Sequence, residues 1–520
     1  MSHPPRGDRR TNAAAGRTVF GGARLHAGLS LILCLLCALP ARANEYSPHG
    51  LYEVEHRVLA NGLRVVLKPR GDARNVSIRV QVKVGTLDFP CGRRETPHFL
   101  EHLLFTGTRA HDETELDALV REWGGNWNAV TTSRQTLYEL DIFSGHFADG
   151  LALLHEILTD STLSAENVAL SRDILRRESG EEPGFLRRWT YARGIGKSGW
   201  DKWLETVGLS CAMLEMPDAI SREDIVDAYR RYYVPNNMAL VIVGAFDATQ
   251  AWPLVEDSFG RRPAGELPVR SPRSIERPPA AVHHENSLTH FVGADADILL
   301  GFTTTGYRGR DRRAVYLLEL YLETRIFERL RVRQGLSYSP TTDSEVWPDA
   351  GLLWLEANAS LGDVDKVIAG LREEIRHLRE HPLSEETVLA LKRESQLGGA
   401  GAYETNASVA DYYVASMHEL EDSGALLNEE DAVMAVSTGD VHRAARNYLD
   451  LDHAVTVVER PLLSYDTLFF AFGSLFVLGG LAAVWRLGPR RRRTRGGAHH
   501  APKSPAAKGV SHRDDMDSHA

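Results

Sequence analysis

The sequence predicts an α+β protein with two similar sandwich domains and one C-terminal membrane-spanning helix. Three observations lead to this prediction. Strand patterns are followed by helix patterns and then by further strands, a helical segment recurs in the second half, and 19 uncharged residues stand near the C-terminus. Runs of strands and runs of helices are typical of α+β sandwiches, whereas doubly wound sheets alternate the two. A chain of 520 residues is long enough for more than one hydrophobic core.

The first elements along the chain are a hairpin and a half-buried strand. Residues 54–60 and 63–68 flank Asn61-Gly62, a dipeptide that favours the tight turn of a hairpin. Apolar residues then occupy every second position of residues 76–84, which predicts a strand with one face in the core. A helix is predicted around Pro97, since proline is tolerated in a first helical turn. Later patterns predict a helix at 116–123, a strand at 136–142 and a helix at 147–158.

A helical segment of the first half recurs in the second. Leu163-Ser164-Ala165-Glu166 leads to Leu175-Arg176-Arg177-Glu178-Ser179, and Leu383-Ser384-Glu385-Glu386 leads to Leu391-Lys392-Arg393-Glu394-Ser395. An amphipathic helix is predicted before each copy. A repeat of this kind predicts two similar domains. We place the first domain at residues 44–260, a proline- and arginine-rich linker at 261–284 and the second domain at 285–464.

Both ends of the chain carry membrane-targeting patterns. Arginines precede an apolar run and the small-residue site Pro40-Ala41-Arg42-Ala43, which predicts a signal peptide over residues 1–43. The uncharged residues 467–485 are long enough for a transmembrane helix. The arginine-rich residues 486–520 are then expected to form a disordered cytoplasmic tail. These patterns predict an inner-membrane protein whose two domains lie in the periplasm.

The net charge and the cysteine content further restrict which kind of protein this is. The formal net charge is −10 and no basic domain stands out, which argues against nucleic acid as a partner. Of the four cysteines, Cys34 and Cys37 lie in the predicted signal peptide. An oxidising compartment permits a disulfide between Cys91 and Cys211. The sequence leaves open whether they pair, and whether Cys91 is instead a metal ligand.

The most specific chemistry lies in His98-Phe99-Leu100-Glu101-His102. Two histidines four residues apart project from one face of a helix, close enough to bind a single metal ion. With the glutamate between them, H-x-x-E-H is the inverted form of a zinc-peptidase signature. A catalytic zinc needs a third protein ligand and an open position for water. We predict Glu178 as that ligand, from a neighbouring helix, and Glu101 as the base that takes a proton from the water.

Two other histidine clusters are interpreted as structural. His377-Leu378-Arg379-Glu380-His381 also fits the pattern, but Pro382 ends its helix at once. The internal repeat aligns this match with residues near Ser161 rather than with the first motif, so we interpret it as a solvated helix end. His283-His284-Glu285, with His290, lies in or near the predicted linker and is not expected to bind a metal.

The chain resembles the inverzincin family of zinc metallopeptidases, which includes pitrilysin, insulin-degrading enzyme and mitochondrial processing peptidase. The similar segments are residues 98–108, 124–129, Glu178, residues 234–244, 325–331 and 334–339. The resemblance covers about residues 50–460 and implies one Zn²⁺ per chain. It also implies a half-clamshell of two domains that closes with a second half around a peptide-sized chamber. In the smaller two-domain branch a second chain supplies that half, which implies a homodimer or a heterodimer with a related chain.

The resemblance also implies substrate contacts. The family's arginine and tyrosine at Arg331 and Tyr338 bind the substrate peptide, and Asn128 and Ala129 would lie by the sheet edge on which substrate docks as a strand. Ser171 departs from the family, which usually has an acid seven residues before the zinc glutamate. The predicted function is a zinc endopeptidase acting on small or unfolded polypeptides. The alternative is a non-catalytic partner subunit that shapes the chamber or presents substrate.

Overall fold

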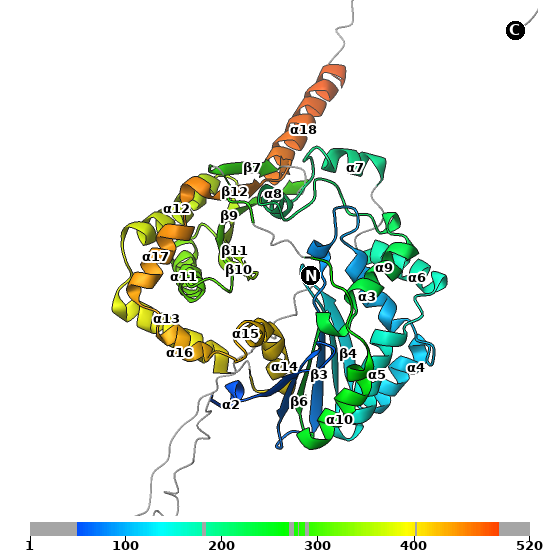
Figure 1. Ribbon diagram of the computed structural model, residues 1–520. Helices are drawn as coiled ribbons and strands as arrows, with labels where there is room; N and C mark the ends of the chain where they lie inside the picture. The colour runs from blue at the N-terminus through cyan, green and yellow to red at the C-terminus, as the bar shows by residue number, and fades with distance from the viewer. Residues whose placement is uncertain are drawn as a thin grey trace, which may run out of the picture.

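The computed structural model describes residues 49–178, 184–269, 275–278, 280–286, 291–400 and 403–487. Two helix-covered β-sheets form the two sides of a ring, and one long helix projects from the ring (Figure 1). The predicted α+β fold class with two sheet-containing domains is confirmed. The predicted signal peptide, residues 1–43, lies outside the described residues.

The first sheet has six strands in the order β1-β2-β6-β3-β5-β4. Their bounds are Glu55–Val58 (β1), Arg64–Pro69 (β2), Met238–Gly244 (β6), Asn75–Val82 (β3), Thr136–Phe143 (β5) and Asn126–Thr131 (β4). The predicted hairpin is present, since β1 pairs antiparallel with β2 and Gly62 has a φ of 84°. Glycine is needed there because a Cβ atom would lie 2.7 Å from Cβ of Asn236.

Helices cover one face of the first sheet. Successive side chains of each strand point to opposite faces of the sheet, and apolar side chains line the covered face. Val65, Leu67, Ile78 and Val80 point into a core that these helices share. The helices are α3 (Thr96–Phe105), α4 (Glu113–Glu122), α5 (Phe147–Asp160), α6 (Ala165–Glu178), α9 (Arg222–Tyr232) and α10 (Ala248–Ser258). Helix α4 begins before the predicted residue 116 because Asp112 and Glu115 form a capping box that satisfies its first backbone N–H groups.

The second sheet has five strands in the order β10-β11-β9-β12-β7. Their bounds are Thr341–Val346 (β10), Ala350–Ser360 (β11), Asp295–Thr305 (β9), Val455–Glu459 (β12) and Val282–Asn286 (β7). The helices of this domain are α11 (Arg312–Ile326), α12 (Val364–Glu380), α13 (Glu385–Ala400), α16 (Glu429–Met434) and α17 (Thr438–Tyr448). The sequence repeat corresponds to the helix pairs α5–α6 and α12–α13. β7 begins within the range predicted as linker, so His283 and His284 lie in a strand.

Each half of the chain contributes helical structure to the inner face of the other half's sheet. Trp203 of α8 (Gly199–Thr206) packs against Leu299 of the second sheet. Helices α14 (Asn406–Ala415) and α15 (Met417–Asp422) pack on the inner face of the first sheet. Arg79 of β3, whose side chain is 2% exposed, pairs with Asp411 of α14 at 2.8 Å. This exchange of helices fixes the two sheets relative to each other.

The C-terminal helix α18 (Tyr465–Leu487) leaves the second domain after a short parallel pairing of β13 (Leu463–Ser464) with β8 (Val292–Gly293). It is long and apolar enough to cross a membrane, and none of its apolar stretch is buried in the protein. Its 23 residues extend about 34 Å, which exceeds the hydrocarbon thickness of a bilayer. Of the tail predicted at 486–520, only residues 486 and 487 belong to the part of the chain that the structure describes.

Candidate metal centre

Helix α3 directs two histidines to its partly exposed side. Four apolar residues of this helix are fully buried in the first core, namely Phe99, Leu100, Leu103 and Leu104. Because residues four apart lie on one helix face, this burial leaves His98 and His102 together on the opposite side. Their Nε2 atoms are 3.3 Å apart.

Glu178, the last residue of α6, completes a group of three potential ligands. Helix α6 packs beside α3, and Oε2 of Glu178 lies 3.5 Å from Nε2 of His98 and 3.4 Å from Nε2 of His102. A tetrahedral zinc ion with bonds of about 2.0–2.2 Å holds its ligand atoms roughly 3.3–3.6 Å apart. The donor set of His98, His102 and Glu178, which we call the metal triangle, therefore fits zinc and leaves a fourth position for water.

Glu101 lies on α3 but outside the metal triangle. Besides burial, its negative charge raises the pKa of two buried tyrosines, Tyr138 of β5 and Tyr233. The hydroxyl groups of these two tyrosines form a hydrogen bond of 2.8 Å with each other. Complete burial raises the pKa of Tyr138, and the neighbouring Tyr233 and Glu101 raise it further. Both phenols thus stay neutral near the glutamate.

A second carboxylate contacts the first histidine. Oε2 of Glu95 lies 2.9 Å from Nδ1 of His98, the ring nitrogen that is not directed at Glu178. Burial lowers the pKa of His98, but the hydrogen bond and the charge of Glu95, together with the charges of Glu101 and Glu178, outweigh burial, so that the pKa is raised. Glu95 is the N-cap residue of α3, yet its side chain makes no capping hydrogen bond. The sequence-based prediction omitted Glu95, although its spacing of three residues from His98 was a usable signal.

Glu95→Ala is expected to weaken zinc binding by about 10–100-fold, the usual effect of losing a carboxylate behind a metal-binding histidine. Without its hydrogen bond, the imidazole of His98 loses its fixed orientation. Competition with a chromogenic chelator measures the zinc affinity. Glu113→Ala, which removes a carboxylate from the first turn of α4, controls for charge at a helix N-terminus. Equal zinc affinities in Glu95→Ala and the wild type would contradict this role.

Ser171 occupies the position at which the resemblance led us to look for an acid. It is completely buried in α6. Its Oγ has no hydrogen-bond partner among the residues that the structure describes. A neutral hydroxyl cannot supply the charge of a carboxylate, so the carboxylate behind the metal triangle comes from Glu95.

A disulfide joins Cys91 and Cys211 just before α3. It answers the question that the sequence left open, and it removes the thiolate that Cys91 would need as a metal ligand. Glu215 lies close to both sulfur atoms, but its carboxylate accepts hydrogen bonds from the backbone N–H of Gly92 (2.9 Å) and Arg94 (3.2 Å). The disulfide and Glu215 together hold the loop that leads into α3, the helix of His98 and His102.

Reduction of this disulfide is expected to lower the midpoint of thermal unfolding. The cross-link spans 120 residues, and restricting an unfolded chain in this way typically contributes about 2–4 kcal/mol to stability. Thermal unfolding of the full chain with and without reductant measures the shift. The matched control, Cys91→Ser with Cys211→Ser, should show the lower midpoint already and should not respond to reductant. An unchanged wild-type midpoint, once thiol labelling has shown reduction, would refute this expectation.

Asn128 and Ala129 lie in β4, the edge strand of the first sheet. They pair with Glu139 and Tyr138 of β5. Helix α3 packs against β4, so this sheet edge lies beside the helix that carries His98 and His102. Because β4 pairs with β5 alone among the described strands, its other side presents backbone groups to which an extended peptide is able to bind.

Arg331 and Tyr338 contact each other in the second domain. Arg331 lies in a π-helical segment, Phe327–Arg333, and its Nη1 donates a hydrogen bond to the carbonyl of Tyr338. Its guanidinium group lies 4.2 Å from the centre of the Tyr338 ring. Asn358 of β11 holds the loop by accepting a hydrogen bond of 3.0 Å from the N–H of Tyr338. None of these contacts reaches the metal triangle.

The second H-x-x-E-H match lies at the end of α12, where the rings of His377 and His381 stack with centroids 4.8 Å apart. Neither histidine belongs to a group of three potential metal ligands in the described part of the chain. The same holds for His283 and His284 of β7. His290 lies outside the described residues.

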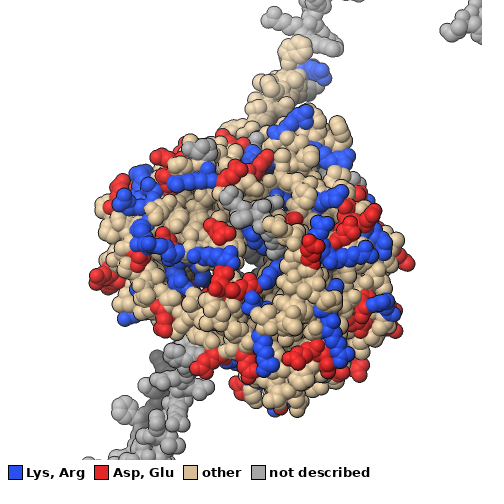
Figure 2. All heavy atoms as spheres, viewed as in Figure 1, with Lys and Arg blue, Asp and Glu red and all other residues tan. Residues whose placement is uncertain are grey.

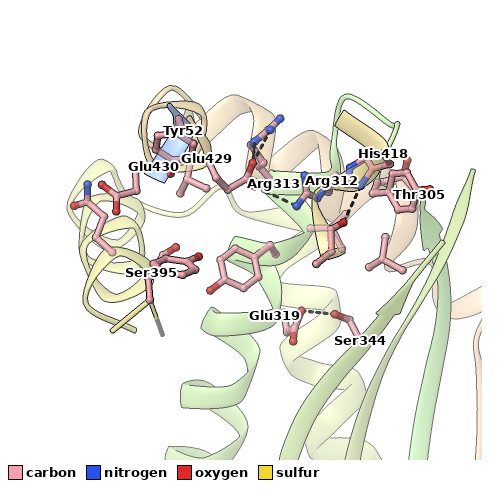
Figure 3. A pocket seen from close by; sticks show the side chains of 18 residues that line it. Tyr52, Thr305, Arg312, Arg313, Glu319, Ser344, Ser395, His418, Glu429 and Glu430 are labelled. Atoms are coloured by element: carbon pink, nitrogen blue, oxygen red, sulfur yellow. Dashed lines mark hydrogen bonds and ion pairs between the residues drawn. The ribbon is translucent and has the colours of Figure 1, made fainter. Parts of the chain in front are cut away.

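A cavity of about 500 Å³ is lined by Tyr52 of the first domain and by residues of the second, and no residue of the metal triangle lines it (Figure 3). Several of its charged groups have polar partners. Arg313 donates to Glu429 at 2.7 Å, and Oγ of Ser344 donates to Glu319 at 2.6 Å. Burial raises the pKa of Glu319. The cavity therefore holds a polar cluster that is separate from the metal triangle.

Two family models match the chain. One is described as insulinase (peptidase family M16) and matches residues 64–182, and the other is described as peptidase M16 inactive domain and matches residues 219–395. An uncharacterized zinc protease of Streptomyces coelicolor is 23% identical over 73% of this chain and 80% of its own length. The beta subunit of mitochondrial-processing peptidase from Lentinula edodes is 24% identical over 77% of this chain and 89% of its own.

A protease from Helicobacter pylori shares the fold, with a TM-score of 0.66 and 18% sequence identity over 79% of this chain and 99% of that chain. The two sheet-containing domains and the two family models define the class as M16-type proteins, whose relatives include proteins named zinc proteases. The chain belongs to peptidase family M16, the pitrilysin family, as its resemblance implied.

Proposed function

We propose that this protein is a zinc-dependent endopeptidase that cuts small or unfolded polypeptides. The metal triangle carries the proposal, because its three ligand atoms lie 3.3–3.5 Å apart, as tetrahedral zinc requires. Glu101 lies next to His102 on the same helix. All four residues fall within the range that matches the insulinase model rather than the range that matches the inactive domain.

Each residue of the proposed centre has a separate role in catalysis. When bound, zinc lowers the pKa of a coordinated water to about 7 and polarises the carbonyl group under attack. His98, His102 and Glu178 would hold the ion, and Glu95 would orient His98. The Glu101 carboxylate accepts the proton of the attacking water and donates it to the leaving amine nitrogen. The β4 edge binds the peptide as an added strand, which positions the scissile bond.

A second chain is proposed to complete the peptide-binding chamber. Arg331 and Tyr338 contact each other in the second domain but do not contact the metal triangle of their own chain. A second copy, or a related chain, would bring its own arginine and tyrosine to this metal centre. The relative named as a beta subunit supports an assembly of paired chains.

We further propose that the protein is held in the inner membrane with both domains in the periplasm. Helix α18 supports this location, since it is apolar, unburied and long enough to span a bilayer. Tyr465 and Trp485 stand near its two ends, where aromatic side chains favour the membrane interface. Arg486 follows at the end assigned to the cytoplasm.

The alternative function is a non-catalytic subunit that shapes the chamber or presents substrate to an active partner. The description of the second matched range as an inactive domain favours it. In that case the chain would bind a partner without cleaving peptides, and the four residues of the centre would have no catalytic use.

Removal of the metal tests the proposal directly. We expect a chelator to abolish hydrolysis of a quenched peptide by the full chain, and one equivalent of Zn²⁺ to restore it. Mg²⁺ should not restore activity, because two imidazoles and one carboxylate favour zinc over a cation that prefers oxygen ligands. Elemental analysis of the purified chain gives the stoichiometry. Hydrolysis that persists without bound metal would refute the peptidase mechanism, and zinc binding without hydrolysis would favour the non-catalytic alternative.

A further inference from the structure

The short helix α7 (Phe185–Tyr191) has no buried residue. Its large apolar side chains are instead exposed, Phe185 at 75%, Leu186 at 69% and Trp189 at 42%. The positions of these three residues lie within an arc of about 100° on a helix, so they form one apolar face. An amphipathic helix normally buries such a face, and this face contacts no core of the described protein.

The segment around α7 is also basic. Residues 184–197 contain Arg187, Arg188, Arg193 and Lys197 but no aspartate or glutamate. The three arginines are exposed, whereas Lys197 is buried and pairs with Glu205. Figure 2 shows lysine and arginine side chains around the base of the projecting helix. Exposed Phe, Leu and Trp beside arginines are typical of helices that lie in the interface of an anionic membrane.

The fold places α7 at the end of the molecule from which α18 leaves. Helix α7 leads into α8, whose first residue, Gly199, donates its backbone N–H to the carboxylate of Glu459. Glu459 is the last residue of β12, and α18 begins six residues later at Tyr465. Figure 1 accordingly shows α7 near the base of α18.

Exposed apolar side chains also surround the start of α18. Phe291 is 64% exposed, Leu462 43% and Tyr465 61%. The N–H of Leu463 donates a hydrogen bond of 3.0 Å to the carbonyl of Phe291, which places these side chains where the chain enters the helix. The surface at this end of the ectodomain therefore combines the arginines and apolar face of the α7 segment with the apolar side chains at the start of α18.

We propose that α7, together with Phe291, Leu462 and Tyr465, forms a membrane-docking surface on the anionic headgroups of the bilayer that α18 crosses. This inference rests on α18 as the membrane anchor, which is part of the proposed function. The apolar face of α7 enters the boundary between headgroups and acyl chains, and Arg187 and Arg193 contact lipid phosphates. Docking fixes the orientation of the ectodomain, so that the metal centre is held at a constant height above the membrane.

Amide hydrogen exchange of the full chain in lipid nanodiscs tests this surface. In nanodiscs of mixed phosphatidylglycerol and phosphatidylcholine, residues 185–197 should exchange at least about tenfold more slowly than in phosphatidylcholine alone. Arg187→Glu with Arg193→Glu should remove the difference between the two lipids. Phe185→Ser with Leu186→Ser should restore fast exchange in both. The matched control, Val58→Ser with Leu427→Ser, replaces side chains that are 54% and 47% exposed elsewhere and should behave as the wild type.

The exchange of residues 467–485 separates failure of the docking surface from failure of the anchor. If those amides are protected in both lipids and residues 185–197 exchange equally fast in both, docking is wrong and the anchor stands. If residues 467–485 are unprotected and the chain does not co-elute with nanodiscs, both are wrong. Protection of residues 185–197 that is independent of lipid and increases with protein concentration would mean that a second copy covers α7, which also overturns the proposal.

Discussion

Glu101→Gln is expected to retain zinc with wild-type affinity and to lower kcat for peptide hydrolysis by about 10²–10⁴-fold, the range that general acid–base catalysis contributes. Glutamine has nearly the same size and shape as glutamate, so helix α3 and its packing should persist. Because Glu101 lies outside the metal triangle, its replacement removes no ligand atom. What is lost is the carboxylate that accepts the proton of the attacking water and delivers it to the leaving amine.

The chain supplies its own matched control for this variant. Glu380→Gln changes the corresponding glutamate in the second H-x-x-E-H match, at the end of α12, where no third ligand approaches His377 in the described residues. Hydrolysis of a quenched peptide and zinc content should be unchanged in that variant. Full activity in Glu101→Gln would exclude Glu101 as the base, and a matching loss of zinc would show that it is a ligand.

Glu178→Ala is expected to deplete zinc and, as a consequence, activity. Its carboxylate contributes one of three ligand atoms, so the loss of affinity should exceed the roughly 10–100-fold expected for a residue that only supports a ligand. Glu178 is the last residue of α6 and its side chain is 48% exposed, so truncation to alanine removes little packing. Zinc content after dialysis against a weak chelator, together with the thermal unfolding midpoint, separates loss of metal from loss of fold.

The internal repeat provides the control for this second variant. Glu394 stands at the position of α13 that corresponds to Glu178 of α6, and it is exposed. Glu394→Ala should leave both zinc content and hydrolysis unchanged, because the second domain has no histidine pair facing that position in the described part of the structure. An undiminished zinc content in Glu178→Ala would rule out Glu178 as a ligand.

Local sequence patterns predicted much of the first domain and the core of the site. The Asn61-Gly62 hairpin, the strand of alternating apolar residues at β3 and the helix pairs of the repeat all depend on neighbours within a few residues. His98 and His102 meet for the same reason, because one helical turn brings them together. The contact between Glu95 and His98 also joins residues that are close in the chain. It was overlooked because Glu95 stands three residues before His98, outside the motif, at the N-cap of the helix.

The sequence by itself determined the periodic elements, the two-domain repeat and the histidine pair, because each of these is specified by residues close in the chain. Only the tertiary structure decided which distant groups meet. It joined Cys91 to Cys211, and it placed α8 on the second sheet and α14 on the first. The sequence pointed to Glu178, but only the packing of α6 beside α3 gave its distance to the two histidines. The physical reason is that such contacts depend on how buried faces pack, and several distant partners satisfy the same amphipathic pattern equally well.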